Sequence, residues 1–173
     1  MTDDPAVLIP AGAPILDAAG WVGRACWAEL ALHEVLTGWL AVEADPAAVA
    51  DLWSARSGAA ARAEAWSQRL PELREFPRPG FVLPPSAAAE ALFADLAGRV
   101  DPADTAGRRD ALAAVLDALA AAYEAHRAVA VGPADAPTAR TLREVLDGLA
   151  AVRSAGVADP EVAAGIAGLG GLL

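Results

Sequence analysis

Proline- and glycine-rich breaks divide this chain into long stretches in which apolar residues recur every three or four positions, the pattern of helices with one buried side. Three of the stretches open with an aspartate followed by a proline, residue types that suit the N-cap and first position of a helix. The sequence therefore predicts these helical ranges: 17–43, 46–70, 86–100, 102–131, 136–155 and a short helix after Asp159. No stretch of useful length alternates apolar and polar residues, so the predicted fold class is all-α.

The connection over residues 71–85 differs from the other breaks because it holds five prolines and a glycine. Proline removes a backbone donor and fixes φ, so this segment is predicted to cross the body as a non-helical connection. Short turns join the first two and the last two long helices. We therefore expect an extended arm (1–16), a four-helix bundle of two antiparallel hairpins joined by the crossover (17–156), and a short helix with a glycine-rich tail (157–173).

Composition narrows the range of functions. All 13 basic residues are arginine, against 23 acidic residues, and the net charge of −10 argues against a nucleic-acid partner. The absence of lysine excludes lysine Schiff bases and a P-loop lysine, and the single cysteine excludes an internal disulfide. Neither a basic leader nor a run of about 20 apolar residues stands out, so we expect a cytoplasmic protein with no membrane partner.

The first predicted helix carries Cys26, Glu29 and His33 at three- and four-residue spacing, which places them on one side of the helix. A carboxylate and an imidazole on an otherwise apolar side are costly unless they are paired or used. Two interpretations stay open. Glu29 and His33 pair with each other or with an arginine, or they belong to a site.

The second predicted helix contributes Glu64, which follows a small and apolar side of the helix and is expected to face inward. The alternative is a partnership with Gln68, or a surface pair with Arg62 or Arg69. On the third long helix Tyr123 and His126 lie within the apolar side, which suggests either a buried hydrogen bond between them or a proton-transfer pair.

Five tryptophans are confined to the first two long helices. Core filling is the ordinary explanation, and the alternative is a pocket with aromatic walls among many alanines. On that alternative we expect Trp39, Trp53 and Cys26 to contact the ligand. The apolar arm and the glycine-rich tail suggest subunit contacts, so we expect a homodimer.

Three segments carry a family resemblance: residues 27–34 (WAELALHE), 64–71 (EAWSQRLP) and 137–142 (PTARTL). With the helix layout, they resemble the ferritin-like superfamily, in particular small actinobacterial members with an incomplete di-iron motif. The resemblance implies a ferritin-like four-helix bundle in which glutamates and Glu-x-x-His motifs enclose two irons. Glu29 matches the first-helix glutamate and Glu64 the second, but Ser67 stands where the motif has histidine. The fourth helix has Glu144 and Asp147 in the matching positions, again without histidine.

These observations lead to three hypotheses. The first is a bundle without metal or cofactor that binds a small apolar or aromatic molecule in its interior, with an acid–base step on that molecule as an extension. Its candidate catalytic residues share one property, an ionisable side chain on a predicted inward side: Glu29, His33, Glu64, Tyr123 and His126. The second hypothesis is a non-catalytic dimerising or adaptor protein. The third is a residual metalloenzyme with Glu29, His33, Glu64 and His126 as ligands.

Overall fold

The computed structural model describes residues 15–131, 134–152 and 157–173. Within them it is built from helices and connections without a strand, which confirms the all-α prediction. The elements are α1 (Ile15–Leu40), α2 (Pro46–Arg69), a short 3₁₀ helix η1 (Arg78–Phe81), α3 (Ala87–Ala97), α4 (Thr105–Val129), α5 (Ala136–Val152) and α6 (Pro160–Gly168). Most of the predicted arm lies outside the described residues, and its last two residues, 15 and 16, belong to α1.

The local start signals act as predicted at three helices. Asp45 caps α2, Ser86 caps α3 and Asp159 caps α6, each by accepting a hydrogen bond from a backbone N–H of the first turn. The predicted start of the long helix after Asp101 is wrong. Asp101 accepts from the backbone N–H of Ala103 in a turn, and α4 begins three residues later with Asp104 as its cap.

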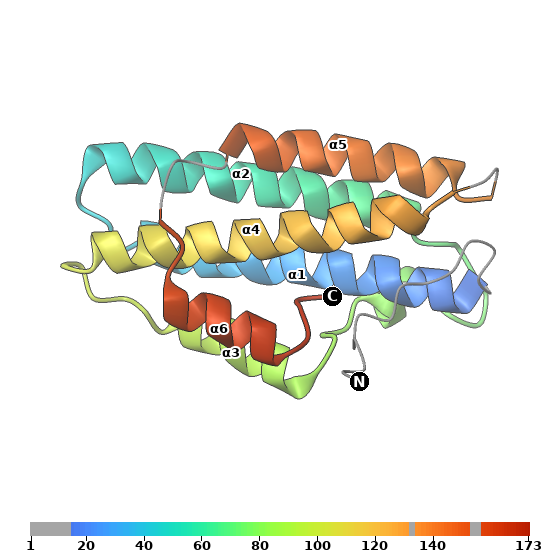
Figure 1. Cartoon of the computed structure of the whole chain (residues 1–173), viewed down its shortest axis with the longest axis horizontal. Helices are drawn as coiled ribbons and strands as arrows, with labels where there is room; N and C mark the ends of the chain where they lie inside the picture. Colours follow the sequence, from blue (N-terminus) through green and yellow to red (C-terminus); the bar gives the residue numbers. More distant parts are fainter. Residues whose placement is uncertain (1–14, 132–133, 153–156) are drawn as a thin grey trace.

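The four long helices lie side by side in two antiparallel pairs, α1 with α2 and α4 with α5 (Figure 1). Helix α2 packs against α5, whereas α1 meets α4 through large side chains such as Trp21 and Tyr123. The chain leaves α2 at one end of the molecule, and α3 runs back along α1 to the end where α4 begins (Figure 1). The shorter α6 packs on α4.

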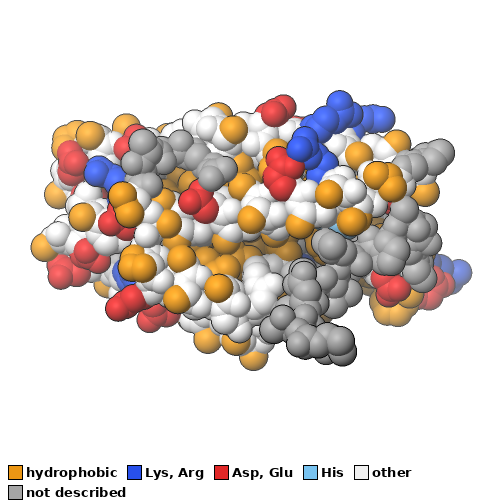
Figure 2. Space-filling model, in the orientation of Figure 1, with side chains coloured by type: hydrophobic (Ala, Val, Ile, Leu, Met, Phe, Trp, Pro, Cys, Tyr) orange, Lys and Arg blue, Asp and Glu red, His pale blue; other side chains and the backbone are white. Residues whose placement is uncertain are grey.

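One apolar core serves all the helices, because buried residues of α3 and α6 belong to the same cluster as those of the long helices. The Trp39 indole N–H, for example, donates to the Leu96 carbonyl at 2.9 Å and ties α1 to α3. Among the described residues, no helix combines the length and the apolar composition needed to cross a bilayer. On the face in Figure 2, basic side chains gather near one end of α5, while acidic and apolar ones are spread across the surface.

Candidate functional site

A buried hydrogen-bonded cluster joins three of the long helices at the centre of the molecule. Glu29 on α1 accepts two bonds from the Arg62 guanidinium on α2, at 2.8 Å from Nε and 2.9 Å from Nη2. It also accepts a bond of 2.8 Å from the Tyr123 hydroxyl on α4. The Tyr123 oxygen in turn accepts from the Trp66 indole N–H at 3.2 Å. We call these four residues the central cluster.

The central cluster is sealed from solvent. Glu29 and Tyr123 have no exposed surface and Arg62 is 3% exposed. Burial raises the pKa of Glu29, and the charge and hydrogen bonds of Arg62 act in the opposite direction. Burial and the nearby Glu29 charge raise the pKa of Tyr123. These side chains are buried and form hydrogen bonds with one another, so they connect the helices and are out of reach of a ligand in solution.

The central cluster settles which partner Glu29 takes. Glu29 faces inward as predicted, and the interpretation in which it pairs with an arginine is the one observed. The alternative in which Arg62 pairs with Glu64 at the surface is wrong, because Arg62 lies in the core. Tyr123 is buried as expected but does not pair with His126.

His126 is buried in a different environment. Its ring stacks on Trp21 with centroids 3.7 Å apart and an interplanar angle of 11°. Its Nδ1 has no hydrogen-bond partner among the described residues. Burial lowers the pKa of His126 to about 4, with smaller opposing contributions from Asp135, which raises it, and Arg24, which lowers it. His126 is therefore neutral near pH 7 and serves as a stacking partner.

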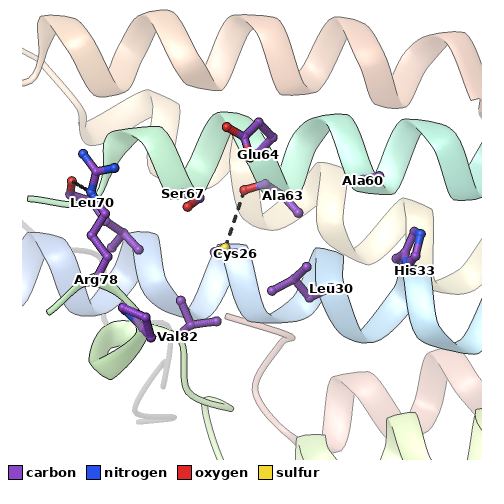
Figure 3. Close-up of a pocket in the computed structure, with 11 residues that line it drawn as sticks. Cys26, Leu30, His33, Ala60, Ala63, Glu64, Ser67, Leu70, Arg78 and Val82 are labelled. Atoms are coloured by element: carbon purple, nitrogen blue, oxygen red, sulfur yellow. Dashed lines mark hydrogen bonds between the residues drawn. The ribbon is translucent and has the colours of Figure 1, made fainter.

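A second candidate site is a cavity of about 410 Å³ between α1 and α2, which we call the α1–α2 groove (Figure 3). Residues spaced by three or four along both helices form its sides, and the crossover closes one end. The lining residues are Cys26, Leu30, His33, Ala60, Ala63, Glu64, Ser67, Leu70, Arg78, Pro79 and Val82. Three sequence-predicted site residues, Cys26, His33 and Glu64, thus share one groove.

The floor of the α1–α2 groove is apolar and unreactive. The Cys26 thiol donates to the Ala63 carbonyl at 3.5 Å, across the line of contact between the two helices (Figure 3). Burial, followed by the charges of Glu29 and Glu64, raises the pKa of Cys26 to about 11. The thiol therefore stays protonated near neutral pH and is a poor nucleophile.

The closed end of the groove depends on an unusually close backbone contact. A side chain at Gly23 on α1 would place its Cβ 2.6 Å from the carbonyl carbon of Phe81 and closer still to its oxygen. Only glycine therefore lets the crossover lie directly on α1. Beside this contact, Arg78 donates from Nε to the Leu70 carbonyl at 3.2 Å and pairs through Nη2 with Glu72 at 3.0 Å.

The polar groups along the groove are only partly engaged. His33 is half-buried, and its ring makes no hydrogen bond within the described part of the chain. Glu64 is exposed on the rim and accepts from Gln68 at 2.8 Å. The prediction that Glu64 faces inward is therefore wrong, because Arg62, Ala63 and Trp66 form the buried side of α2 and turn position 64 outward. The alternative partnership with Gln68 is the one observed.

The two tryptophans predicted to contact a ligand do not line the groove. Trp39 is buried against α3, as its bond to Leu96 shows. Trp53 is 59% exposed on α2, and the Arg56 guanidinium carbon lies 5.3 Å from its ring centre. Alanine dominates α2, so its apolar pattern indicated the buried side poorly, and the assignment of Trp53 to an inward side is wrong.

The side chains considered as metal ligands do not converge. Glu29 is enclosed by Arg62 and Tyr123, His126 stacks on Trp21, and His33 lies in the groove. Across the described ranges, no three side chains of histidine, cysteine, aspartate or glutamate are placed to share a metal ion.

Besides the burial of Arg62, sequence reasoning missed two structural features built around arginines. One is the buried pair of Arg108 and Glu43, 2.6 Å apart, to which the Thr105 hydroxyl adds bonds of 2.9 and 3.1 Å. The hydrogen bond from Arg108 is the main cause that lowers the pKa of Glu43 to about 2. The other is Arg78 at the groove. The available signal for Arg78 was its place between two prolines in a segment predicted to lie on the body.

Comparison with known proteins gives no match to a family model, a curated protein or a solved structure.

Proposed function

We propose that the protein binds a small, largely apolar molecule in the α1–α2 groove. The observation that carries this proposal is the groove itself, a cavity of about 410 Å³ with an apolar floor and few polar groups. Ligand sites in proteins have this character and volumes of roughly 300–1,000 Å³. The expected location therefore moves from the bundle interior, which the central cluster fills, to the side of the molecule.

Binding is the function that the chemistry of the groove supports best. The Cys26 thiol is protonated and hydrogen-bonded, so it offers no nucleophile. Glu29 and Tyr123, two of the predicted acid–base residues, are sealed in the central cluster. Of the predicted catalytic residues, His33 lines the groove with an imidazole that makes no hydrogen bond within the described ranges, so an acid–base step on a bound molecule would fall to it.

A dye titration tests this proposal. The uncharged dye 1-aminoanthracene is expected to become more fluorescent when it enters the groove. Ala60→Trp fills the groove from its exposed side and should weaken dye binding at least tenfold, whereas Ala61→Trp, on the neighbouring exposed position outside the groove, should leave it unchanged. Circular dichroism establishes that both variants are folded. Equal binding by the two variants, or none by the wild type, would overturn the proposal.

We also propose that the chain is a ferritin-like bundle protein without a complete metal site. Two antiparallel helix pairs joined by a long connection support this, as does Glu29 at the first-helix position of the motif. The positive charge beside Glu29 at the centre comes from the Arg62 guanidinium. Iron(II), manganese(II) or zinc(II) is therefore expected to leave the melting temperature unchanged, and a rise that grows with metal concentration would contradict the proposal.

The second candidate is a dimerising role, and one observation favours it. Trp53 is largely exposed with Arg56 stacked above it, and both residue types are enriched at protein interfaces. The partner on this candidate is a second copy of the chain. Light scattering at increasing protein concentration should show a dimer for the wild type and a monomer for Trp53→Ser. A wild type that is monomeric throughout would remove the candidate.

A further inference from the structure

We propose that the molecule bound in the α1–α2 groove is an apolar acid whose carboxylate binds Arg78. This inference rests on the proposed function of the groove and adds the chemical class of the ligand. Four observations carry it: the fixed position of Arg78, its two donors accessible to a ligand, the apolar path leading away from it, and the placement of the opposing negative charge.

Arg78 is held in position before any ligand arrives. Its backbone lies between Pro77 and Pro79, whose rings each fix one φ angle. Its Nε donates to the Leu70 carbonyl at the end of α2, which orients the plane of the guanidinium. The segment that carries it rests on α1 at Gly23, where no side chain would fit. A ligand therefore meets a guanidinium that is already ordered, which lowers the entropic cost of binding.

Two of the donors of Arg78 remain accessible to a ligand. In the described part of the chain Nη1 makes no hydrogen bond, and Nη2 contacts Glu72, whose side chain is 79% exposed. The Arg78 side chain is 39% exposed and that of Glu72 79%, so water screens the pair mainly on the Glu72 side, and a ligand carboxylate that lies within the groove can replace Glu72. A guanidinium fork matches the two oxygens of a carboxylate, which favours this group over a single hydroxyl or carbonyl.

The groove leads from Arg78 along apolar surface. Val82 and Leu70 lie near the Arg78 end, Cys26 and Ala63 follow, and His33 lies at the other end (Figure 3). The α1 segment from Cys26 to His33 spans about 10 Å at 1.5 Å per residue. This path suits a two-ring aromatic acid or a medium-chain aliphatic acid, with its polar group at one end only.

Negative charge on the rim restricts where the carboxylate can lie. Glu64 faces solvent near the middle of the groove, and the chain carries a net charge of −10. Both disfavour an anion, so the ligand carboxylate has to lie at the Arg78 end and its apolar body beside Glu64. It follows that Glu64→Gln should strengthen the binding of an acid more than that of its neutral analogue.

A matched pair of probes tests the inference. 2-Naphthoic acid and its neutral isostere 2-naphthamide are titrated at pH 8 against bound 1-aminoanthracene. We expect the wild type to prefer the acid at least tenfold. Arg78→Gln should abolish the preference by lowering the affinity for the acid at least tenfold more than that for the amide, and continued dye binding by this variant shows that the groove is intact. Glu72→Gln should strengthen acid binding, and Arg74→Gln, an exposed arginine outside the groove, should change nothing.

The outcomes separate the two proposals. If the amide binds as tightly as the acid, or Arg78→Gln weakens both equally, the assignment of an acid is wrong while the groove remains a binding site. If neither compound displaces the dye and the dye does not respond to Ala60→Trp, the proposed function itself fails. Arg78→Lys keeps the charge without the fork and should retain only part of the acid preference.

Discussion

Replacing Glu29 with methionine tests whether the central cluster holds the helices together. Methionine is close to glutamate in size and flexible, so it fills the space with little strain. The change removes the acceptor of all three hydrogen bonds that Glu29 receives, two from Arg62 and one from Tyr123. Arg62 Nη1 has no hydrogen-bond partner among the described residues, so the variant leaves the whole guanidinium buried, at 3% exposure, without the Glu29 counter-charge.

The expected loss is large. Breaking a buried ion pair by removing one partner costs about 3–5 kcal/mol, against a total stability of about 5–15 kcal/mol for a typical domain. In the double variant Glu29→Met/Arg62→Met the orphaned charge is gone, so we expect it to regain at least about 2 kcal/mol over Glu29→Met. The Tyr123 hydroxyl then lacks an acceptor, which keeps the double variant about 1–3 kcal/mol below the wild type.

Urea unfolding followed by far-UV circular dichroism measures these free energies, with an unchanged m-value as evidence that the transition is comparable. The comparison of the two single variants with the double variant gives the coupling energy of the pair. A Glu29→Met loss below about 1 kcal/mol, or a double variant as unstable as the sum of the singles, would refute the structural role of the cluster.

Three further predictions follow from single contacts. Gly23→Ala should destabilise the protein by about 1–3 kcal/mol in urea unfolding and weaken dye binding, because the crossover must shift. Gly38→Ala is the control: Gly38 has open space around it, so this variant should be more stable than the wild type by up to about 1 kcal/mol. At pH 8, Cys26 should react with iodoacetamide roughly 100-fold more slowly in the folded protein than in urea, since its pKa rises from 9.0 to about 11; equal rates would contradict its burial. Because the pKa of His126 in the folded protein is about 4, the unfolded chain takes up a proton first as the pH falls, and stability should drop by about 3 kcal/mol between pH 6.5 and 4. The variant His126→Phe keeps the stack on Trp21 and should lack this drop. If its stability depends on pH as that of the wild type does, His126 is not the source.

Part of the central cluster was predictable. Glu29 and Tyr123 lie on the apolar sides of their helices, and spacing alone indicated that both face inward. The burial of Arg62 was not predictable, because an arginine in an alanine-rich helix is expected at the surface, although its side-chain stem is apolar. Glu64, two positions later, fitted the apolar pattern of α2 equally well, and only the packing of α2 against α5 and α1 decides between them.

The groove, too, was only partly predictable from the sequence. Cys26 and His33 were singled out because they share a side of α1. Arg78 and the closed end depend on the contact between Gly23 and Phe81, which are far apart in the sequence. The prolines of the crossover indicated a non-helical connection packed against the helices, but they did not indicate which part of the helix surface it would contact.

The sequence by itself determined the helices and most of their starts, because helical periodicity and N-capping act between residues a few positions apart. The tertiary structure alone decided the partner of Glu29, the outward position of Glu64 and the shape of the groove. These features depend on which sides of the helices meet. Alanines are abundant and can be either buried or exposed at little cost, so a few large side chains and one close backbone contact determine how the helices pack.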